Sequence, residues 1–590
     1  MQKPQATIFV KLILALQLGV IFCSTISFGQ STNNSKLNQS LTSKRNTVQA
    51  KISSPIRTPV FSPSLNVVKG GFGVFEQMFV LTGNYNNVWE DVQITVTYTA
   101  PDATQIVGGG FHYDGTIWKS RVAPNMAGNW TWSASIVENG GTPTMDTGGF
   151  TVVKQISPGF IKRRQNTLRW INDNGTPFNP LGIGDCVYNR WNGIDFNTIY
   201  LGIDGGITLP DPPLPGSPEP LGSTWGTPST YASAYGNGTA ESANFNVFRV
   251  SPANCAISIF TLIELNGNVY DKVNSIRYDT LITTMKSKGF RIFFAIFNRS
   301  DVYNSSPAYL MQYEKAVKYI VDRYGAYVDF WDLVNEGDDY ANDDFLNAIG
   351  AYVKTADPYD HPVTSSFSPG SQTQHDFTQA DFTSPHVYAS ESEYDSDTFI
   401  ADIINSYKPL NKPILFGESG NSVVNVDPTS ALRMRLRSWT AFFDEGALLF
   451  WNASYLQGIF GDINSPSNQY IGPTERNFMR HLQNYTSYFP AAESSALPVS
   501  DPTKIRGYRL SAAATYGVYI HAFTEHEMLT TDKIITIAPQ FTGNAAWINP
   551  STGERIGEKF SVSAGTRDIP VPGFKTDIAL KISCSTCPID

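Results

Sequence analysis

Two short stretches of the chain decide its fold: Val328-Asp-Phe-Trp-Asp-Leu-Val-Asn-Glu336 and Pro413-Ile-Leu-Phe-Gly-Glu418. Each stretch is rich in apolar and aromatic residues, ends in a glutamate and is followed by polar sequence. This is the pattern of a fully buried parallel strand that carries a carboxylate at its carboxyl end. In a barrel of parallel strands, those ends carry the chemistry.

Further strand-like segments surround these two. In all, eight segments are predicted as parallel strands: 178–183, 246–250, 290–297, 328–335, 361–366, 382–387, 413–418 and 447–451. Helical patterns lie between them, as over 310–324, where apolar residues recur every three or four positions. Strands alternating with amphipathic helices predict a (β/α)8 TIM barrel. Pro362 makes 361–366 the least regular strand, because a central strand needs the backbone N–H that proline lacks.

The paired glutamates indicate a chemistry. Either one alone would be interpreted as a solvated surface acid. Cleavage of a glycosidic bond, however, needs one carboxyl group that gives a proton to the leaving oxygen and a second that attacks the anomeric carbon as a carboxylate. Glu336 and Glu418, at the ends of two strands of one barrel, are suited to that task.

Several motifs, taken in order, resemble clan A of the glycoside hydrolases, in the manner of a family 5 barrel. The matching segments are Phe248-Arg249-Val250, Asn335-Glu336, His386-Val-Tyr388, Glu418 and Phe450-Trp451. Each motif is weak alone, but five in the expected order are hard to produce by accident. With its flanking strands and helices, the resemblance covers a little over half of the chain.

The resemblance implies a role for each matching residue: acid/base for Glu336, nucleophile for Glu418, ion pairing with the nucleophile for Arg249, contact with the sugar 2-hydroxyl for Asn335, tuning of the nucleophile for His386 and Tyr388, and a sugar platform for Trp451. It further implies a retaining enzyme for β-linked plant or algal polysaccharides or their oligosaccharides. We expect no cofactor and no metal, because the sequence has no phosphate-binding glycine loop and no histidines at metal-binding spacing. The alternative is a catalytically inactive carbohydrate-binding or scaffold barrel, which would normally have lost one glutamate or the arginine; all three are present.

The first residues are predicted to form an export signal. Lys3 and Lys11 precede an apolar run over 12–23, and small residues at Ser27 and Gly29 suit a cut before residue 30. We therefore expect a signal peptide over 1–29, a secreted or periplasmic protein, and no membrane anchor after cleavage. A lipoprotein anchor at Cys23 is the alternative, which the bulky preceding residue disfavours. Residues 30–57 are polar and are predicted to form a disordered linker.

Four cysteines remain beyond the leader. Cys186 and Cys255 follow the first and second predicted barrel strands, so an oxidising compartment would allow a disulfide between them. Cys584 and Cys587 could form a small terminal disulfide or half of a zinc site. The disulfide is favoured, because no second cysteine pair or histidine cluster lies nearby in the sequence.

Both ends of the chain have strand periodicity. We expect an N-terminal β-sandwich over 58–154, the barrel over 155–495 and a C-terminal β-sandwich over 496–590. Trp118, Trp130 and Trp132 are predicted to be core residues, with sugar binding as the alternative.

A long Gly- and Pro-rich segment over 203–244 separates the first two barrel strands. Long loops of this kind are often functional. Its Trp225, Tyr231 and Tyr235 are candidates for stacking on sugar rings, Trp225 above all; the alternative is a loop that packs on itself through the same residues.

The net charge of −9 is mild for 590 residues and argues against nucleic acid or an anionic membrane as a partner. It leaves the oligomeric state open. A sulfated red-algal galactan of the agar or carrageenan type is an alternative substrate. Its sulfate groups would need local arginines, for which the candidates are Arg163, Arg164, Arg190 and Arg299, each of which is otherwise a solvated surface charge.

Overall fold

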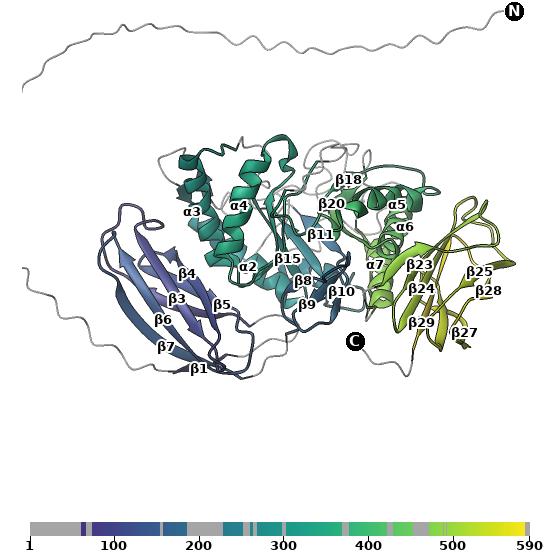
Figure 1. Ribbon diagram of the computed structural model, residues 1–590, viewed down its shortest axis with the longest axis horizontal. Coiled ribbons are helices and arrows are strands. Elements are labelled where there is room, and N and C mark those ends of the chain that lie inside the picture. The colour runs from purple at the N-terminus through teal and green to yellow at the C-terminus, as the bar shows by residue number, and fades with distance from the viewer. Residues whose placement is uncertain are drawn as a thin grey trace, which may run out of the picture. The chain divides into compact units, whose positions relative to one another are not determined.

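The computed structural model describes residues 61–65, 73–153, 157–185, 228–251, 260–262, 268–297, 303–368, 377–421, 429–451, 471–487, 489, 490 and 492–584. Figure 1 shows the elements formed by these residues. Within these ranges, no helix has both the length and the apolar character needed to cross a bilayer. Trp225, Arg190, Arg299 and the cysteines at 23, 186, 255 and 587 lie outside the described residues.

The centre of the fold is a seven-stranded parallel sheet with the order β17-β16-β15-β12-β11-β21-β19. Its strands, in that order, are Val363–Thr364, Val328–Val334, Arg291–Phe297, Val247–Val250, Gly182–Asp185, Gly446–Trp451 and Ile414–Phe416. Residues of β15 and β16 are buried on both faces, as expected for strands covered by helices.

The two ends of this sheet approach each other through a further parallel pair. β18 (His386–Tyr388) pairs with β20 (Glu418–Gly420), which directly follows β19. Isolated parallel bridges join Phe367 to Pro385 and Thr383 to Ile414. The sheet is therefore strongly curled, and its pairing is consistent with at least a partial barrel.

Helices follow most of the parallel strands. They are α1 (Pro228–Tyr235), α2 (Lys272–Ser287), α3 (Pro307–Tyr324), α4 (Asp343–Ala356), α5 (Ser396–Tyr407), α6 (Ser430–Phe443) and α7 (Pro473–Thr486), with 3₁₀ turns η1 (Gly337–Asp339) and η2 (Lys408–Leu410). α2 and α4 begin where the sequence provides caps: Asp271 accepts from the Asn274 N–H, and Asn342 accepts from the Phe345 N–H.

The first predicted strand is displaced from where the sequence pattern put it. The parallel strand is Gly182–Asp185, whereas Phe178 belongs to β10 (Pro177–Phe178), which pairs with β9 (Trp170–Asn172) and, through it, with β8 (Ile161–Arg163). The physical reason is that Trp170 packs into the apolar core of the curled sheet, with ring centroids 5.1 Å from Phe330 and 5.3 Å from Phe382. The small antiparallel sheet therefore uses the apolar residues that precede Gly182.

The segment 203–244 was predicted to be irregular, but its end forms α1. Tyr235 is fully buried and its hydroxyl donates to the Ile471 carbonyl, so it is a core residue and does not stack on a ligand. The side chain of Tyr231 lies outside the described residues. A separate hairpin consists of β13 (Phe260–Leu262) and β14 (Asn268–Tyr270).

The N-terminal strands form one seven-stranded sheet with the order β1-β7-β6-β3-β4-β5-β2. Its strands in chain order are Phe61–Leu65, Phe75–Val80, Val92–Thr99, Gln105–Asp114, Ile117–Val122, Gly128–Glu138 and Thr144–Val152. Phe75 on β2 stacks on Phe150 on β7 with centroids 3.8 Å apart, so the sheet folds over onto itself. Trp118, Trp130 and Trp132 are buried in this core, which confirms their predicted place.

The C-terminal strands form a six-stranded sheet with the order β22-β23-β24-β29-β26-β27 and a pair, β25-β28. Their bounds, in that order, are Glu493–Ala496, Ile505–Ser511, Thr515–Ala522, Asp577–Ser583, Gly543–Ile548, Arg555–Val562, Lys533–Ile537 and Arg567–Val571. Ile535 and Ile569 of the pair share one apolar core with Val518 and Leu580 of the larger sheet. Cys584, which follows β29, is disulfide-bonded.

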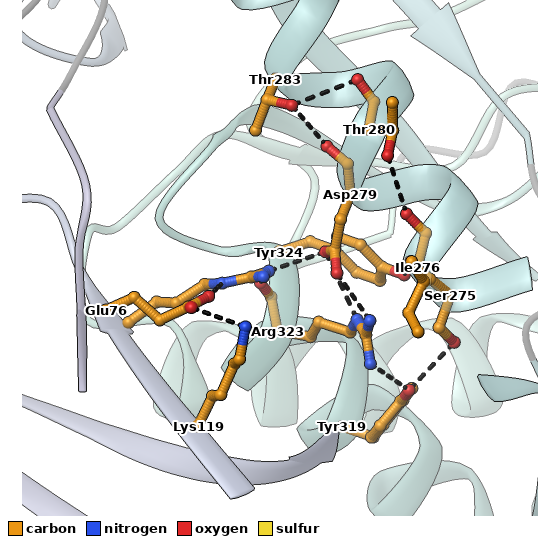
Figure 2. Close-up of polar contacts among 11 residues, drawn as sticks. Glu76, Lys119, Ser275, Ile276, Asp279, Thr280, Thr283, Tyr319, Arg323 and Tyr324 are labelled. Carbon is orange, nitrogen blue, oxygen red and sulfur yellow. Dashed lines mark hydrogen bonds and ion pairs between the residues drawn. The ribbon is translucent and has the colours of Figure 1, made fainter. Parts of the chain in front are cut away.

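A buried ionic cluster joins the N-terminal sheet to the helices of the parallel sheet (Figure 2). Asp279 on α2 accepts from Arg121 on β5 at 2.8 Å and from Arg323 on α3 at 2.6 Å. Arg323 also donates to the Tyr319 hydroxyl, which donates to Ser275. These charged groups are nearly excluded from water. Removing one of them would therefore leave its partners as uncompensated buried charges.

Candidate active site

The carboxyl ends of four strand segments bring the predicted residues together. Arg249 lies on β12, Asn335 and Glu336 follow β16, His386 and Tyr388 belong to β18, and Glu418 begins β20. Parallel pairing places His386 directly beside Glu418. These side chains come from positions 249 to 418, and only the barrel-like curl of the sheet makes them neighbours.

Arg249 is the hub of the site and is fully buried. Its Nη1 donates to Glu418 Oε1 at 2.6 Å, and its Nη2 donates to Asp332 Oδ2 at 2.7 Å and to Asn335 Oδ1 at 2.6 Å. Burial alone would lower the pKa of Arg249, but the carboxylates of Asp332 and Glu418 outweigh burial and raise it. The guanidinium is therefore a fixed positive charge among two carboxylates.

Glu418 receives a second hydrogen bond from the other side. The Tyr388 hydroxyl donates to Glu418 Oε2 at 2.5 Å. Burial, and after it the neighbouring Glu418 carboxylate, raise the pKa of Tyr388 well above its ordinary value, so the phenol keeps its proton and donates. Each oxygen of Glu418 thus accepts one strong hydrogen bond.

Glu336 has a different environment. Its Oε1 lies 2.9 Å from His386 Nδ1. Its backbone is left-handed, with φ 48° and ψ 51°. For a residue other than glycine this conformation costs about 1 kcal/mol or more and is characteristic of functional sites.

The two carboxylates are close together. One oxygen of Glu336, one oxygen of Glu418 and one nitrogen of His386 all lie within 4.8 Å of one another. This donor set has the composition of a metal site, yet the Arg249 guanidinium already bonds Glu418 at 2.6 Å and would repel a cation. We therefore assign no metal ligands, and the pair is suited to proton transfer and nucleophilic attack.

The remaining predicted residues line the same place. The Asn335 Nδ2 amide is buried and has no acceptor within the described part of the chain, so it has a hydrogen bond to offer. Trp451, at the end of β21, is 7% exposed and lies against Gly184, where an added Cβ would come within 2.8 Å of the indole ring. The role of Trp451 as a sugar platform stays a prediction.

Two arginines considered for sulfate binding lie elsewhere. Arg163 belongs to β8 and donates to the Asn411 carbonyl, and Arg164 follows it. Their small sheet packs through Trp170 on Phe330, near the start of β16, whereas Glu336 follows the end of that strand. Neither arginine therefore lines the site.

Two functional-site residues were missed by the sequence reasoning. Asp332 and Ser366 are fully buried and contact Arg249. Asp332 had a sequence signal, because a charged residue inside an otherwise apolar strand must find a buried partner. Ser366 had none, since serine is common at strand ends.

Comparison with known proteins supports the fold. Residues 70–137 match a family model described as a domain of unknown function, DUF5060. No curated protein matches the sequence. A protein from Bacteroides vulgatus ATCC 8482, provisionally described as a glycoside hydrolase, has 13% identity and a TM-score of 0.59, covering 88% of this chain and 100% of its own. A structure described as a glycoside hydrolase has 15% identity and a TM-score of 0.50, covering 73% of this chain and 98% of its own. The chain thus has the fold of glycoside hydrolase structures.

Proposed function

We propose that the protein is a retaining glycoside hydrolase that cleaves β-linked polysaccharides or oligosaccharides of plant or algal origin. One observation carries the proposal: the Glu418 carboxylate, held by Arg249 and Tyr388, lies beside Glu336, with one oxygen of each glutamate within 4.8 Å of the other. A retaining mechanism uses two carboxyl groups roughly 5–5.5 Å apart, and an inverting one uses a separation of roughly 6.5–9.5 Å.

The unequal surroundings of the two glutamates support unequal roles. Glu418, with one strong donor on each oxygen, attacks the anomeric carbon and forms a covalent glycosyl-enzyme. Glu336, whose Oε1 lies 2.9 Å from His386 Nδ1, protonates the leaving oxygen and then takes a proton from the water that releases the sugar. Asn335 offers its free amide to the sugar 2-hydroxyl, and Trp451 packs on the ring.

The setting of the site is part of the same proposal. The parallel segments would close into a (β/α)8 barrel flanked by two β-sandwiches, with the bridges at Phe367–Pro385 and Thr383–Ile414 completing the ring. Export through the leader at 1–29 would place the protein in an oxidising compartment, which agrees with the disulfide at Cys584.

Substitution of each glutamate tests the roles. Glu336→Ala should still attack an activated aryl β-glycoside, because that leaving group needs no protonation, and added azide should release a β-glycosyl azide. Glu418→Ala should lose attack on the same substrate and yield at best an α-glycosyl azide. Glu138→Ala, in β6, serves as the control with parental activity. Exchanged azide products would reverse the roles, and parental activity in both glutamate variants would refute the proposal.

A further inference from the structure

Asp332 has no role in the reaction scheme above, yet it is one of the most completely buried charges in the described part of the chain. It lies on β16, four residues before Glu336. Its Oδ2 accepts from Arg249 Nη2 at 2.7 Å, while Arg249 Nη1 bonds Glu418 at 2.6 Å. One guanidinium is thus divided between two carboxylates, and only Glu418 is placed to react.

The same carboxylate organises Ser366. Asp332 Oδ1 accepts from the Ser366 backbone N–H at 2.8 Å, and Oδ2 accepts from the Ser366 hydroxyl at 2.8 Å. The orientation of that hydroxyl is therefore fixed, with its lone pairs turned toward other donors.

Ser366 in turn holds the backbone at Glu336. Its Oγ accepts from the Glu336 N–H at 3.1 Å, and its carbonyl accepts from the Gly337 N–H at 2.9 Å. Glu336 is the residue with the left-handed backbone, which persists only where the surroundings fix it. The contacts form a continuous chain from Glu418 through Arg249, Asp332 and Ser366 to Glu336.

We propose that Asp332 is a positioning residue. It shares the Arg249 guanidinium with Glu418 and, through Ser366, fixes the backbone conformation of Glu336. The inference rests on the proposed function, since it assigns how the two reacting carboxylates are held. Without Asp332, Glu418 would be the one carboxylate among the described hydrogen-bond partners of Arg249, and Ser366 would lose the acceptor that orients its hydroxyl.

Asp332→Asn tests the division of charge, because the amide keeps the shape and removes the negative charge. The groups that face Glu418 are Arg249 from β12, His386 and Tyr388 from β18, and Glu336 after β16. Loss of a buried negative charge behind Arg249 favours the ionised form of Glu418. We expect the acidic limb of the kcat/KM profile on an activated aryl β-glycoside to move down by about 1–2 pH units.

Asp329→Asn is the matched control. Asp329 is a fully buried aspartate three residues earlier on the same strand and is paired with Lys286 and Arg291, far from the reacting groups along β16. It should lose stability as Asp332→Asn does, yet keep the parental pH profile. A shift of equal size in both variants, or in neither, would overturn the proposal.

Ser366→Ala tests the second half and keeps the proposal testable if Asp332→Asn does not fold. In the first step, which kcat/KM reports, Glu336 matters only where the leaving group needs a proton. The kcat/KM on a natural β-linked substrate should therefore fall at least about tenfold more than the kcat/KM on the activated aryl glycoside. An equal loss on both substrates would contradict the link to Glu336.

A titration without turnover separates this proposal from the proposed function. In protein labelled with ¹³C at the glutamate carboxyl groups, Glu418→Gln identifies the signal of Glu418. The Glu418 titration should move to lower pH in Asp332→Asn and stay in place in Asp329→Asn. If the Glu418 signal does not move in Asp332→Asn, the positioning role of Asp332 is wrong, even if Glu336 and Glu418 are catalytic. If the signal moves but the Glu336 and Glu418 variants keep parental activity, only the proposed hydrolysis is wrong.

Discussion

Asp279 is expected to be the most sensitive single position in the attachment of the N-terminal sheet. Asp279→Ala removes the carboxylate that accepts from Arg121 at 2.8 Å and from Arg323 at 2.6 Å (Figure 2). Arg121 keeps Glu76 at 2.9 Å and the Arg323 carbonyl, but the fully buried side chain of Arg323 keeps only the Tyr319 hydroxyl as an acceptor among its described hydrogen bonds. Removal of one partner from a buried ion pair costs about 3–5 kcal/mol, and we expect a loss in this range.

The assay is urea unfolding followed by tryptophan fluorescence, with Asp114→Ala as the control. Asp114 joins the same sheet to α2 through Lys272 at 2.7 Å, but both side chains are about half exposed, at 51% and 41%. Such exposed pairs contribute about 0–1 kcal/mol. If Asp279→Ala and Asp114→Ala destabilise the protein by the same amount, the argument from burial is wrong.

The pH dependence gives a second check on Asp279. Burial would raise the pKa of Asp279, but the charges of Arg121 and Arg323 outweigh burial and hold it below its usual value. The stabilisation is therefore fully present above the unfolded pKa of about 3.9 and is lost as the pH falls through the lower folded value. The difference between the parent and Asp279→Ala should shrink in acid and stay constant between pH 6 and 8, which urea unfolding at a series of pH values measures.

Three further predictions concern single side chains. Tyr388→Phe removes the donor to Glu418 Oε2, so it should lower kcat about 10- to 100-fold and cost about 1–3 kcal/mol of stability, measured by steady-state kinetics and calorimetry; a loss of kcat under threefold would contradict its role. Gly417→Ala would place a Cβ 3.0 Å from His386 Nε2 and 3.3 Å from Arg249 Nε, so activity should fall at least about tenfold while the far-ultraviolet circular dichroism spectrum is kept. His526, whose pKa burial and then the charge of His521 lower to about 4, stabilises the fold fully above pH about 6.5 and loses this effect as the pH falls toward 4; His526→Gln should remove about 2 kcal/mol of the stability loss between pH 7 and 5 in urea titrations, and an unchanged loss would refute the assignment.

Periodicity predicted much of the central sheet. The runs that end at Glu336 and Glu418 are continuous and apolar, so their strands were found almost at their true bounds. The first strand was placed too early, because Phe178 is apolar enough for a parallel strand but pairs with Trp170 in the small antiparallel sheet. Sequence alone does not tell which of two apolar neighbours enters a parallel sheet.

The site was predicted where residue type is itself informative. Paired glutamates, a buried arginine and a His-x-Tyr strand indicate chemistry, and the structure brings them into contact around Arg249. Ser366 could not be predicted from the sequence, because its role depends on which strands are neighbours. The curl of the sheet determines those neighbours. The importance of the Asp332 carboxylate for the site became clear only from its complete burial.

The most direct test of the account is covalent trapping of the nucleophile. A panel of activated 2-deoxy-2-fluoro-β-glycosides slows release of the glycosyl-enzyme, and mass spectrometry of a peptic digest locates the added sugar. We expect one sugar on the peptide that contains Glu418, with no labelling of Glu418→Gln. A sugar attached to the Glu336 peptide, or hydrolysis of natural substrates with inversion at the anomeric carbon, would contradict it.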